Sequence, residues 1–389
     1  MSQPAEVLAA AIKAEAQRLG FQLAGITTPD PPPHLGVYEN WLAQGRQASL
    51  HYLATERARQ RRADPRLILP ECRSILVLGI RYYAPTSTAP AVESAAAVYA
   101  PSGRVAAYAR GDDYHEVLVE RMQVLVRYIE NLVGRPVANR YYTDTGPVLE
   151  RDLAQRAGLG WIGKNTCLIH PRQGSYFLLT EILLDLDLPA DDPFESDHCG
   201  SCRRCLEACP TQCILPDRTL VAGRCISYLT IELKEQIPAD LRGPVGDWVF
   251  GCDICQQVCP WNQRFAGKEG DAAFTPRLEA REVQLMDELR LTPHEFNLKF
   301  KTSPVRRVKR RGYLRNVAVA LGNARDEGAV EVLGEVLENE NEVLVRSQAA
   351  WALGEIGGEA ARARLAAARQ QETDPEVLAE IESALQRPG

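Results

Sequence analysis

The sequence predicts three successive regions: a mixed α/β region, a short cysteine-rich region and a C-terminal α-helical repeat. Strand-like and helix-like segments alternate over the first 190 residues, which favours an α/β layered domain. Two runs of cysteines occupy residues 199–209 and 252–259. A self-similar pattern with a period of about thirty residues follows, which is typical of stacked helix pairs.

A few segments carry the prediction for the first region. Residues 74–80 form a short apolar run of the buried-strand type, and residues 137–143 and 175–184 are further strand candidates. Residues 112–133 are predicted to form a helix because apolar side chains recur at spacings of four and three. Pro147 suits the first turn of the helix that follows, since its missing N–H would have no partner there.

The N-terminal residues 1–20 have no basic segment and no continuous apolar core, so a signal peptide is not expected. They favour an amphipathic helix with Val7, Leu8, Ile12 and Leu19 on or near one face. No apolar run reaches membrane-spanning length, and free thiols favour a reducing compartment. We therefore expect a cytoplasmic protein without membrane contact. A formal charge of −6 argues against general coating of nucleic acid but permits a local basic patch.

The two cysteine runs indicate a pair of iron–sulfur clusters. The first run has the C-x-x-C-x-x-C-x-x-x-C-P spacing of bacterial ferredoxins, in which the cysteine before proline binds the other cluster. The second run ends in the same way but lacks a first cysteine, which Cys225 can supply. The crossover rule assigns one four-iron cluster to Cys199, Cys202, Cys205 and Cys259, and the other to Cys209, Cys225, Cys252 and Cys255. Such a chain transfers electrons one at a time.

Zinc and disulfides are the alternatives for these spacings. Zinc usually takes two well-separated pairs, and three closely spaced cysteines followed by Cys-Pro fit one tetrahedral site poorly. Disulfides are not expected because nothing in the sequence indicates secretion. The remaining cysteines, Cys72, Cys167 and Cys213, lie in apolar stretches and are expected to be small buried hydrophobes.

A G-x-G-x-x-G pattern at residues 158–163 resembles a dinucleotide fingerprint. That fingerprint follows a strand and opens a helix, so that the phosphates meet the helix N-terminus. Here the glycines follow a predicted helix at 148–157, and Lys164 and Asn165 come next. We therefore predict a tight turn after a helix, not a nicotinamide or flavin site.

Residues 305–389 contain the internal repeat. Residues 314–322 resemble residues 345–354, and residues 374–385 form a third, incomplete copy, which suggests helix pairs of the HEAT type. A basic run without an acid precedes and enters the first copy: Arg306, Arg307, Lys309, Arg310, Arg311 and Arg315. Such a run is usually a solvated face, but the rest of the repeat is acidic, which leaves a phosphate-backbone contact as an equal alternative.

Four further motifs follow one another along the chain. They are TDTGPVLER at 143–151, GLGWIGKN at 158–165, CISYLTIE at 225–232 and GCDICQQVCPWN at 251–262. Together with the ferredoxin run they resemble the epoxyqueuosine reductases, which perform the last step of queuosine synthesis in tRNA. The resemblance covers nearly the whole chain, including the helical repeat, the cluster ligands and the aspartate motif.

The resemblance implies a cobalamin in the α/β domain, close to one cluster, and a relation to the reductive dehalogenases. It also implies that the epoxycyclopentanediol of epoxyqueuosine is reduced to the cyclopentene of queuosine at the tRNA wobble position. Clusters deliver single electrons at low potential, and reduced corrinoid cobalt is a strong nucleophile. The leaving oxygen needs protonation, and the family's proton donor matches Asp144. By its own context Asp144 would only be a turn residue before Pro147.

Contacts to the corrin are expected beside the glycine turn, beside the cluster ligands and in one arginine run. The candidates are Arg62, Asp144, Lys164, Asn165, Thr166, Ser227 and Asp253. His115, at a predicted helix start, is expected to be structural, because no D-x-H-x-x-G pattern of histidine-ligated corrinoid proteins is present. The lower axial base should therefore be displaced without histidine replacement.

We expect an α/β cobalamin-binding domain at 1–190, a ferredoxin-like domain with two [4Fe–4S] clusters at 191–265, a connector at 266–304 and a tRNA-contacting HEAT-like repeat at 305–389. An external low-potential electron donor is required, and a monomer is expected. One alternative is a corrinoid iron–sulfur reductase of a small molecule, against which the basic run and the repeat argue. The other is an electron carrier without catalysis, against which the α/β domain and the aspartate motif argue.

Overall fold

The computed structural model describes residues 4–82, 101–267, 269–277 and 283–387. These form two compact units. Unit 1 contains the described residues of Met1–Thr86, Asp112–Gly223 and Ile254–Thr275. Unit 2 contains the described residues of Ser87–Gly111, Arg224–Asp253 and Pro276–Gly389. The units cut across the predicted domain boundaries, because residues 224–253 of the ferredoxin-like region pack on the first helix of the repeat.

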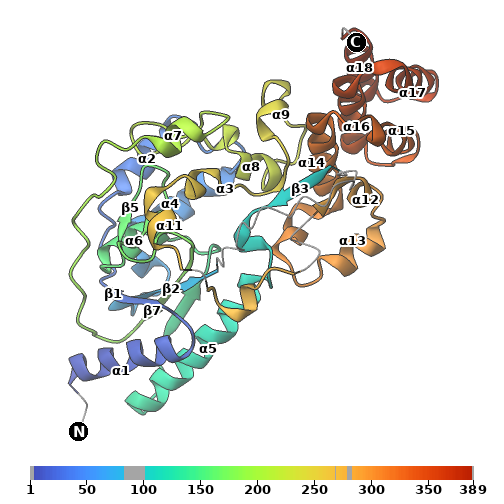
Figure 1. Cartoon of the computed structure of the whole chain (residues 1–389). Coiled ribbons are helices and arrows are strands. Elements are labelled where there is room, and N and C mark those ends of the chain that lie inside the picture. The colour runs from blue at the N-terminus through green and yellow to red at the C-terminus, as the bar shows by residue number, and fades with distance from the viewer. Residues whose placement is uncertain (1–3, 83–100, 268, 278–282, 388–389) are drawn as a thin grey trace. The chain divides into compact units, whose positions relative to one another are not determined.

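Unit 1 is built on a four-stranded antiparallel sheet (Figure 1). In sheet order its strands are β1 (Leu23–Thr27), β2 (Ser74–Arg81), β7 (Phe177–Leu184) and β4 (Asn139–Tyr142). The predicted strands at 74–80, 137–143 and 175–184 correspond to β2, β4 and β7. In the register of the sheet, Glu181 of β7 lies opposite Val77 of β2 and Tyr142 of β4.

Helices cover both faces of this sheet, as expected for an α/β layered domain. On one face lie α1 (Ala5–Arg18) and α5 (Tyr114–Val133), which pack against each other (Figure 1). On the other face lies α6 (Glu150–Arg156). Side chains of a strand alternate between the two faces. Thr180 contacts Met122 of α5, so Glu181 points toward the α6 face, as do Leu179 and Leu183 in the apolar cluster there.

The start of one helix and the buried face of another differ from the sequence prediction. The helix after Pro147 begins only at Glu150, because the backbone of residues 144–149 forms a bent loop first. The N-terminal helix buries Ala9, Ile12 and Ala16, whereas Val7 of the predicted apolar face is 52% exposed. Small side chains face inward there because α1 lies close against α5.

The shorter elements of unit 1 carry the cysteines and the loops around them. They are α2 (Leu35–Ala43), α3 (His51–Ala54), α4 (Glu56–Ala63), β5 (Trp161–Ile162), β6 (Leu168–Ile169), α7 (Arg204–Ala208), α10 (Ile254–Gln257) and α11 (Pro260–Phe265). Strands β5 and β6 form a small hairpin. Gly160 has φ of +150°, and a Cβ there would lie 2.2 Å from the Ile169 carbonyl oxygen. The glycine pattern thus serves a close turn, as predicted.

Unit 2 contains a small sheet and the helical repeat. Strand β3 (Ser102–Val105) pairs with β8 (Trp248–Phe250) and β9 (Val283–Gln284). The helices before the repeat are α8 (Ile226–Ile231), α9 (Ala239–Val245), α12 (Leu285–Leu289) and α13 (Pro293–Lys299). None of the helices in the described part of the chain combines the length and hydropathy needed to cross a bilayer.

The three sequence copies of the repeat form one layer of helices, α14 (Lys309–Ala324), α16 (Val343–Ile356) and α18 (Pro375–Leu385). The second layer consists of α15 (Val330–Asn339) and α17 (Gly358–Gln371). Small residues lie where the helices touch: a Cβ on Gly322 would be 2.8 Å from the Ala352 Cα, and one on Gly354 would be 2.6 Å from the Ala384 Cβ. This is the close packing that the repeat predicted.

Arg315 on α14 is completely buried. Its guanidinium donates hydrogen bonds to the carbonyl oxygens of Leu229 at 2.6 Å, Glu235 at 2.7 Å and Leu233 at 2.8 Å. Burial lowers its pKa to about 10, so it remains charged at neutral pH. Arg315 satisfies the carbonyls at the end of α8 and therefore has no surface for a phosphate. This removes it from the predicted tRNA-contacting set.

Replacing Arg315 with alanine should destabilise the chain by about 3 kcal/mol or more, because three buried carbonyl groups would each lose a hydrogen bond. Urea unfolding of the full-length protein measures the change. The control is Arg306→Ala, an exposed residue of the same basic run, which should stay within about 0.5 kcal/mol of the parent. Equal stability of both variants would contradict the structural role.

Candidate active site

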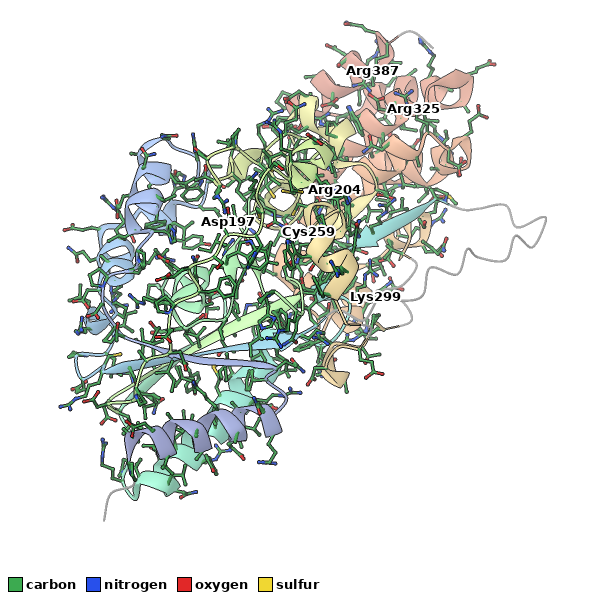
Figure 2. The ribbon with its side chains drawn as sticks, turned by 60° about the vertical axis from the view of Figure 1, so that its left-hand side comes forward. Asp197, Arg204, Cys259, Lys299, Arg325 and Arg387 are labelled. Atoms are coloured by element: carbon green, nitrogen blue, oxygen red, sulfur yellow. The ribbon has the colours of Figure 1, made fainter. Side chains whose placement is uncertain are left out.

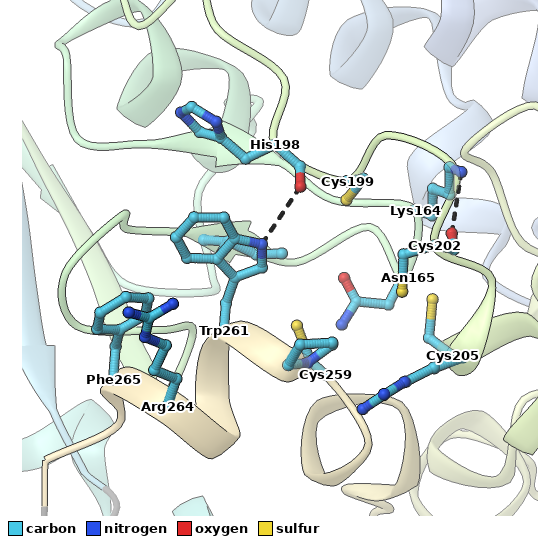
Figure 3. Close-up of a pocket in the computed structure, with 13 residues that line it drawn as sticks. Lys164, Asn165, His198, Cys199, Cys202, Cys205, Cys259, Trp261, Arg264 and Phe265 are labelled. Carbon is cyan, nitrogen blue, oxygen red and sulfur yellow. Dashed lines mark hydrogen bonds between the residues drawn. The ribbon is translucent and has the colours of Figure 1, made fainter.

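Four cysteines line one cavity of about 290 Å³ in unit 1. They are Cys199, Cys202, Cys205 and Cys259, the set that the crossover rule assigned to a single cluster. Figure 3 shows their sulfur atoms facing a common space, with the Asn165 amide among them. The first three come from the loop before α7 and from α7 itself, and the fourth caps α11.

The arrangement fits a polynuclear cluster better than a single ion. Four thiolates around one zinc would lie about 3.8 Å apart, given zinc–sulfur bonds of about 2.3 Å in a tetrahedron. Within the described residues, no three His, Cys, Asp or Glu side chains converge in the manner of a single-ion site. The four thiols line a cavity of about 290 Å³, as expected for residues that enclose a four-iron cluster.

Side chains from the α/β part of unit 1 fix the first cysteine loop. The Lys164 ammonium donates to the carbonyl oxygens of Gly200 at 2.6 Å and Cys202 at 3.0 Å. The Trp161 indole N–H lies 3.5 Å from the Cys199 sulfur. A donor to a cluster sulfur stabilises the reduced state and raises the reduction potential. Lys164 and Trp161 thus shape the cluster loop, a role that the sequence did not assign to either.

A buried polar network fixes the second cysteine run. The Asn262 amide oxygen accepts from the Ser175 backbone N–H at 2.6 Å, and its nitrogen donates to the Ser175 hydroxyl at 2.9 Å. The same nitrogen donates to the Gln256 carbonyl at 2.8 Å. A Cβ on Gly174 would lie 2.2 Å from the Asn262 amide oxygen, so only glycine fits there. This network holds α10 and α11, and with them Cys259, beside the end of β7.

Aromatic and basic side chains complete the cavity wall. Trp261 makes edge-on contact with Trp161, with ring centroids 5.0 Å apart, and its indole donates to the His198 carbonyl at 3.3 Å (Figure 3). Exposed Arg204 and Arg264 also line the cavity. Arg204 and Cys259 are labelled in Figure 2. The aromatic rings shield the thiols from water on one side, while the arginines place positive charge beside an anionic cluster.

The predicted ligands of the second cluster are divided between the units. Cys209 and Cys255 belong to unit 1, and Cys225 and Cys252 belong to unit 2. The Cys209 sulfur lies 3.5 Å from the Cys213 sulfur. Hydrogen bonds, of which the one with Cys213 has the largest effect, lower the pKa of Cys209 to about 5. Cys213 is buried as expected, but it also contacts a predicted ligand.

Two predicted corrin contacts lie beside the cysteines of unit 2. Ser227 is in α8, whose N-cap is Cys225, and it is half-buried. Asp253 is buried, and its carboxylate accepts a hydrogen bond from the Ala107 backbone N–H at 2.7 Å. Burial raises the pKa of Asp253 to about 6.

The predicted acid, Asp144, lies in the loop between β4 and α6 and is exposed. Its φ is +55°, a left-handed conformation that aspartate tolerates better than most residues. Its backbone N–H donates to the Glu150 carboxylate at 2.7 Å, and its carboxylate accepts from the Tyr114 hydroxyl at 2.9 Å. Tyr114 and Glu150 hold the backbone and side chain of Asp144, and the sequence prediction named neither.

Two carboxyl groups behind Asp144 were also missed. Burial raises the pKa of Glu150 to about 7, and the negative charge of Asp144 makes a smaller contribution in the same direction. Glu181 on β7 is completely buried, and burial raises its pKa well above the usual range. Within the described residues neither of its carboxyl oxygens has a hydrogen-bond partner. The signal in the sequence was a single acid inside the apolar run 175–184.

The other predicted corrin contacts of unit 1 have mixed surroundings. Arg62 is buried, with its guanidinium 5.7 Å from the ring centroid of Tyr38. Thr166 has φ of +65°, and its carbonyl accepts from Arg151 at 2.7 Å. Asn165 is buried in the cluster cavity and donates to the Cys255 carbonyl at 3.4 Å. Lys164 and Asn165 therefore serve the cysteine loops directly.

The predicted tRNA contacts fall into exposed and paired residues. Arg306, Arg307, Lys309 and Arg311 are exposed, although Arg307 also forms an ion pair with Glu232 at 2.7 Å. Arg310 is half-buried, because it forms an ion pair with Glu340 at 2.6 Å. Arg311 also lines a cavity of about 610 Å³ with Lys234, a further basic residue that the sequence did not indicate.

Three parts of the chain match known families. Residues 198–262 match the 4Fe-4S double cluster binding domain, and residues 312–386 match HEAT repeats. Residues 62–145 match the family described as Epoxyqueuosine reductase QueG, DUF1730. These matches confirm the iron–sulfur and HEAT-like parts of the predicted fold.

Two curated relatives of this chain are both named epoxyqueuosine reductase. The epoxyqueuosine reductase of Xanthomonas campestris is 40% identical over 352 residues, which is 90% of this chain and 96% of that protein. The epoxyqueuosine reductase of Pseudomonas aeruginosa is 38% identical over 351 residues, covering 90% and 95% of the two chains. This chain belongs to the epoxyqueuosine reductase family. The resemblance predicted from its motifs is confirmed.

Two solved epoxyqueuosine reductases share the fold. One, from Bacillus subtilis, was crystallised with its aspartate catalytic loop swung out of the active site; it is 28% identical with a TM-score of 0.86 over 98% of this chain and 99% of that one. The other was crystallised with an epoxyqueuosine-modified tRNA-Tyr stem loop and is 28% identical with a TM-score of 0.87 over the same shares.

Replacing Cys259 with alanine should remove one of two clusters, because Cys259 lines the cavity shared by Cys199, Cys202 and Cys205. Iron and sulfide per chain after anaerobic reconstitution should fall by about half. The control is Cys167→Ala, a cysteine that does not belong to either predicted ligand set and should leave both values unchanged. Full iron content in the Cys259 variant would refute the ligand assignment.

Proposed function

We propose that this chain reduces epoxyqueuosine to queuosine at the wobble position of tRNA. The observation that carries the proposal is the presence, in one compact unit, of a four-thiol cavity and an exposed aspartate held on a left-handed turn. Family membership supplies the substrate, since a structural relative was crystallised with an epoxyqueuosine-modified stem loop.

Two [4Fe–4S] clusters and cobalamin are the cofactors of the family. When bound, they supply low-potential electrons and a reduced cobalt centre able to act on an epoxide carbon. An external low-potential donor must refill the clusters. The cysteines of the cavity hold one cluster, while Trp161 tunes it by its N–H near Cys199. Arg62, Thr166, Ser227 and Asp253 remain the proposed contacts to the corrin, with Lys164 and Asn165 acting from the cluster loop.

Asp144 is the proposed proton donor to the departing epoxide oxygen. The Tyr114 hydroxyl fixes one carboxyl oxygen of Asp144 and so orients the carboxyl group that gives its proton to the substrate. The Glu150 carboxylate fixes the backbone of the same residue. The relative from Bacillus subtilis also has an aspartate on a catalytic loop, which supports this role for a loop residue.

The exposed basic residues before α14 are proposed to bind the tRNA backbone. Arg306, Lys309 and Arg311 present cations to solvent, whereas Arg307 is paired with Glu232 and Arg310 with Glu340, so these two add less. A tRNA substrate and clusters that require reducing conditions also support a cytoplasmic location. We expect a monomer that binds one anticodon stem-loop. The small-molecule alternative is not favoured by any feature of the site.

Replacing Asp144 with asparagine should lower the turnover number by about 10²–10⁴-fold, because asparagine keeps the hydrogen bond from Tyr114 but cannot give up a proton. Protein reconstituted with iron, sulfide and cobalamin is given epoxyqueuosine-containing tRNA, and the digested nucleosides are weighed by mass spectrometry. Iron content and the cobalamin absorption spectrum should match those of the parent. Retained turnover would exclude Asp144 as the acid.

Replacing Arg306 and Arg311 together with alanine should weaken tRNA binding and reduce the slope of log Kd against log salt by about two. Both are exposed and belong to the basic run. The matched control is Arg325→Ala, an exposed arginine of the same repeat that is paired with Glu355 (Figure 2). If the control lowers affinity and slope as much as the double variant, the basic run is not the contact surface.

A further inference from the structure

The proposed reaction needs more than one proton. Removing an epoxide oxygen as water breaks two carbon–oxygen bonds, consumes two electrons and takes up two protons. Asp144 can hold only one proton at a time. The second proton must therefore reach the oxygen from another group or through a refilled Asp144.

A line of carboxyl groups leads from Asp144 into the protein. The Glu150 carboxylate accepts the backbone N–H of Asp144 at 2.7 Å. Helix α6, which begins with Glu150, packs on β7, the strand that carries Glu181. Glu181 lies opposite Tyr142 in the sheet, and its side chain points toward the α6 face. Tyr142 is only two residues before Asp144 in the chain. The three groups therefore occupy one side of the sheet.

The carboxyl group of Glu181 does not hold the fold together through hydrogen bonds, whereas its backbone belongs to the sheet. It is completely buried among apolar side chains, and within the described residues both of its carboxyl oxygens lack a partner and no cation pairs with it. A charged carboxylate in such a place is very unfavourable, whereas a neutral carboxylic acid is tolerable. The position therefore holds a protonated group.

The charges around this line are mixed. Arg62 from α4 and Arg151 from α6 favour the ionised form of Glu150, while Asp144 opposes it. Glu150 and Asp144 both oppose ionisation of Glu181, and Tyr142 is its neighbour on β4. With a pKa of about 7, Glu150 is protonated below neutral pH and loses its proton as the pH rises through that value.

We propose that Glu150 and Glu181 form a proton store that refills Asp144, so that both protons of the reaction pass through one residue at the substrate. This inference rests on the proposed function of Asp144 as the acid. Glu150 and Glu181 act through Asp144 and are proton-storing and positioning residues rather than catalytic ones. The proton taken from the store is replaced from solvent between turnovers.

The first test needs no substrate and no cobalamin. Infrared spectra of the purified protein are recorded across a pH range, and the carbonyl stretch of protonated carboxylic acids is followed. The parent should retain this signal at neutral pH, and Glu181→Gln and Glu150→Gln should each remove part of it. The matched control is Asp152→Asn, a buried carboxylate on α6 that is paired with His34 at 2.8 Å. An unchanged signal in both glutamine variants would overturn the store.

The second test is the pH dependence of single-turnover reduction. Glutamine is the neutral isostere of protonated glutamate, so Glu181→Gln should keep the fold while losing the proton. Its rate should match the parent in acid and fall by about tenfold at about pH 8, where solvent protons are scarce. Glu150→Gln keeps an oxygen for the Asp144 N–H and covers a failure of the first variant to fold. Its rate should fall below that of the parent near pH 7 and approach the parent's rate at about pH 8, where Glu150 of the parent has already lost its proton. Asp152→Asn should keep the parent profile.

The outcomes separate the store from the function on which it rests. If Asp144→Asn is inactive while both glutamine variants keep the parent profile, the proposed function stands and the store is wrong. If the parent itself does not reduce epoxyqueuosine with both cofactors bound, the proposed function fails. In that case the infrared titration alone decides whether Glu150 and Glu181 hold protons at neutral pH.

Discussion

The active site depends on the buried hydrogen bonds between Asn262, Ser175 and Gln256. The Asn262 amide uses its oxygen and its nitrogen on partners at the end of the sheet and at α10, so it cannot shift without leaving polar groups unpaired. Because Cys259 is only three residues earlier, this amide sets the position of one cluster ligand relative to three from a distant run. Gly174 is required because its missing side chain admits the amide.

Unit 2 also contains a buried asparagine that fixes the segments carrying predicted cluster ligands. Asn316 donates to the Thr230 and Val249 carbonyls at 2.8 Å each, and neighbouring Arg315 satisfies the end of α8. The segments that carry Cys225 and Cys252 are thereby held on α14. A short cysteine-rich segment has little apolar surface with which to order itself. The larger parts of the chain therefore provide side chains that fix its loops.

Local patterns account for what could be predicted from the sequence. The sequence predicts elements whose pattern is set within one element. These are the apolar run of β2, the periodicity of α5 and the three repeat copies in α14, α16 and α18. The cysteine spacing is equally local. The polar networks could not be predicted from the sequence. Arg315 in a basic run and Asn262 in a cysteine motif look like surface residues until their distant partners are known.

The acid site shows the same limit. Asp144 was identified from a resemblance, but nothing in its motif indicates that Tyr114 and Glu150 hold it, because Tyr114 lies thirty residues earlier and Glu150 reaches back across a loop. This contact depends on the start of the helix at Glu150 rather than at Pro147. Six residues of loop allow Asp144 to take a left-handed φ while the first residue of the helix turns its carboxylate onto the loop backbone.

Glu150 and Glu181 must be considered as one titrating pair. Neighbouring carboxylates disfavour each other's ionised forms, so protons leave the pair in steps that belong to neither residue alone. The negative charge of Asp144 disfavours the ionised forms of both glutamates, so it favours protons held by Glu150 and Glu181. Burial of Glu181 without a hydrogen-bond partner lowers stability relative to an apolar side chain, because a polar group is desolvated without compensation. The cost is understandable if the site needs a proton that remains bound at neutral pH and lies within reach of an exposed acid.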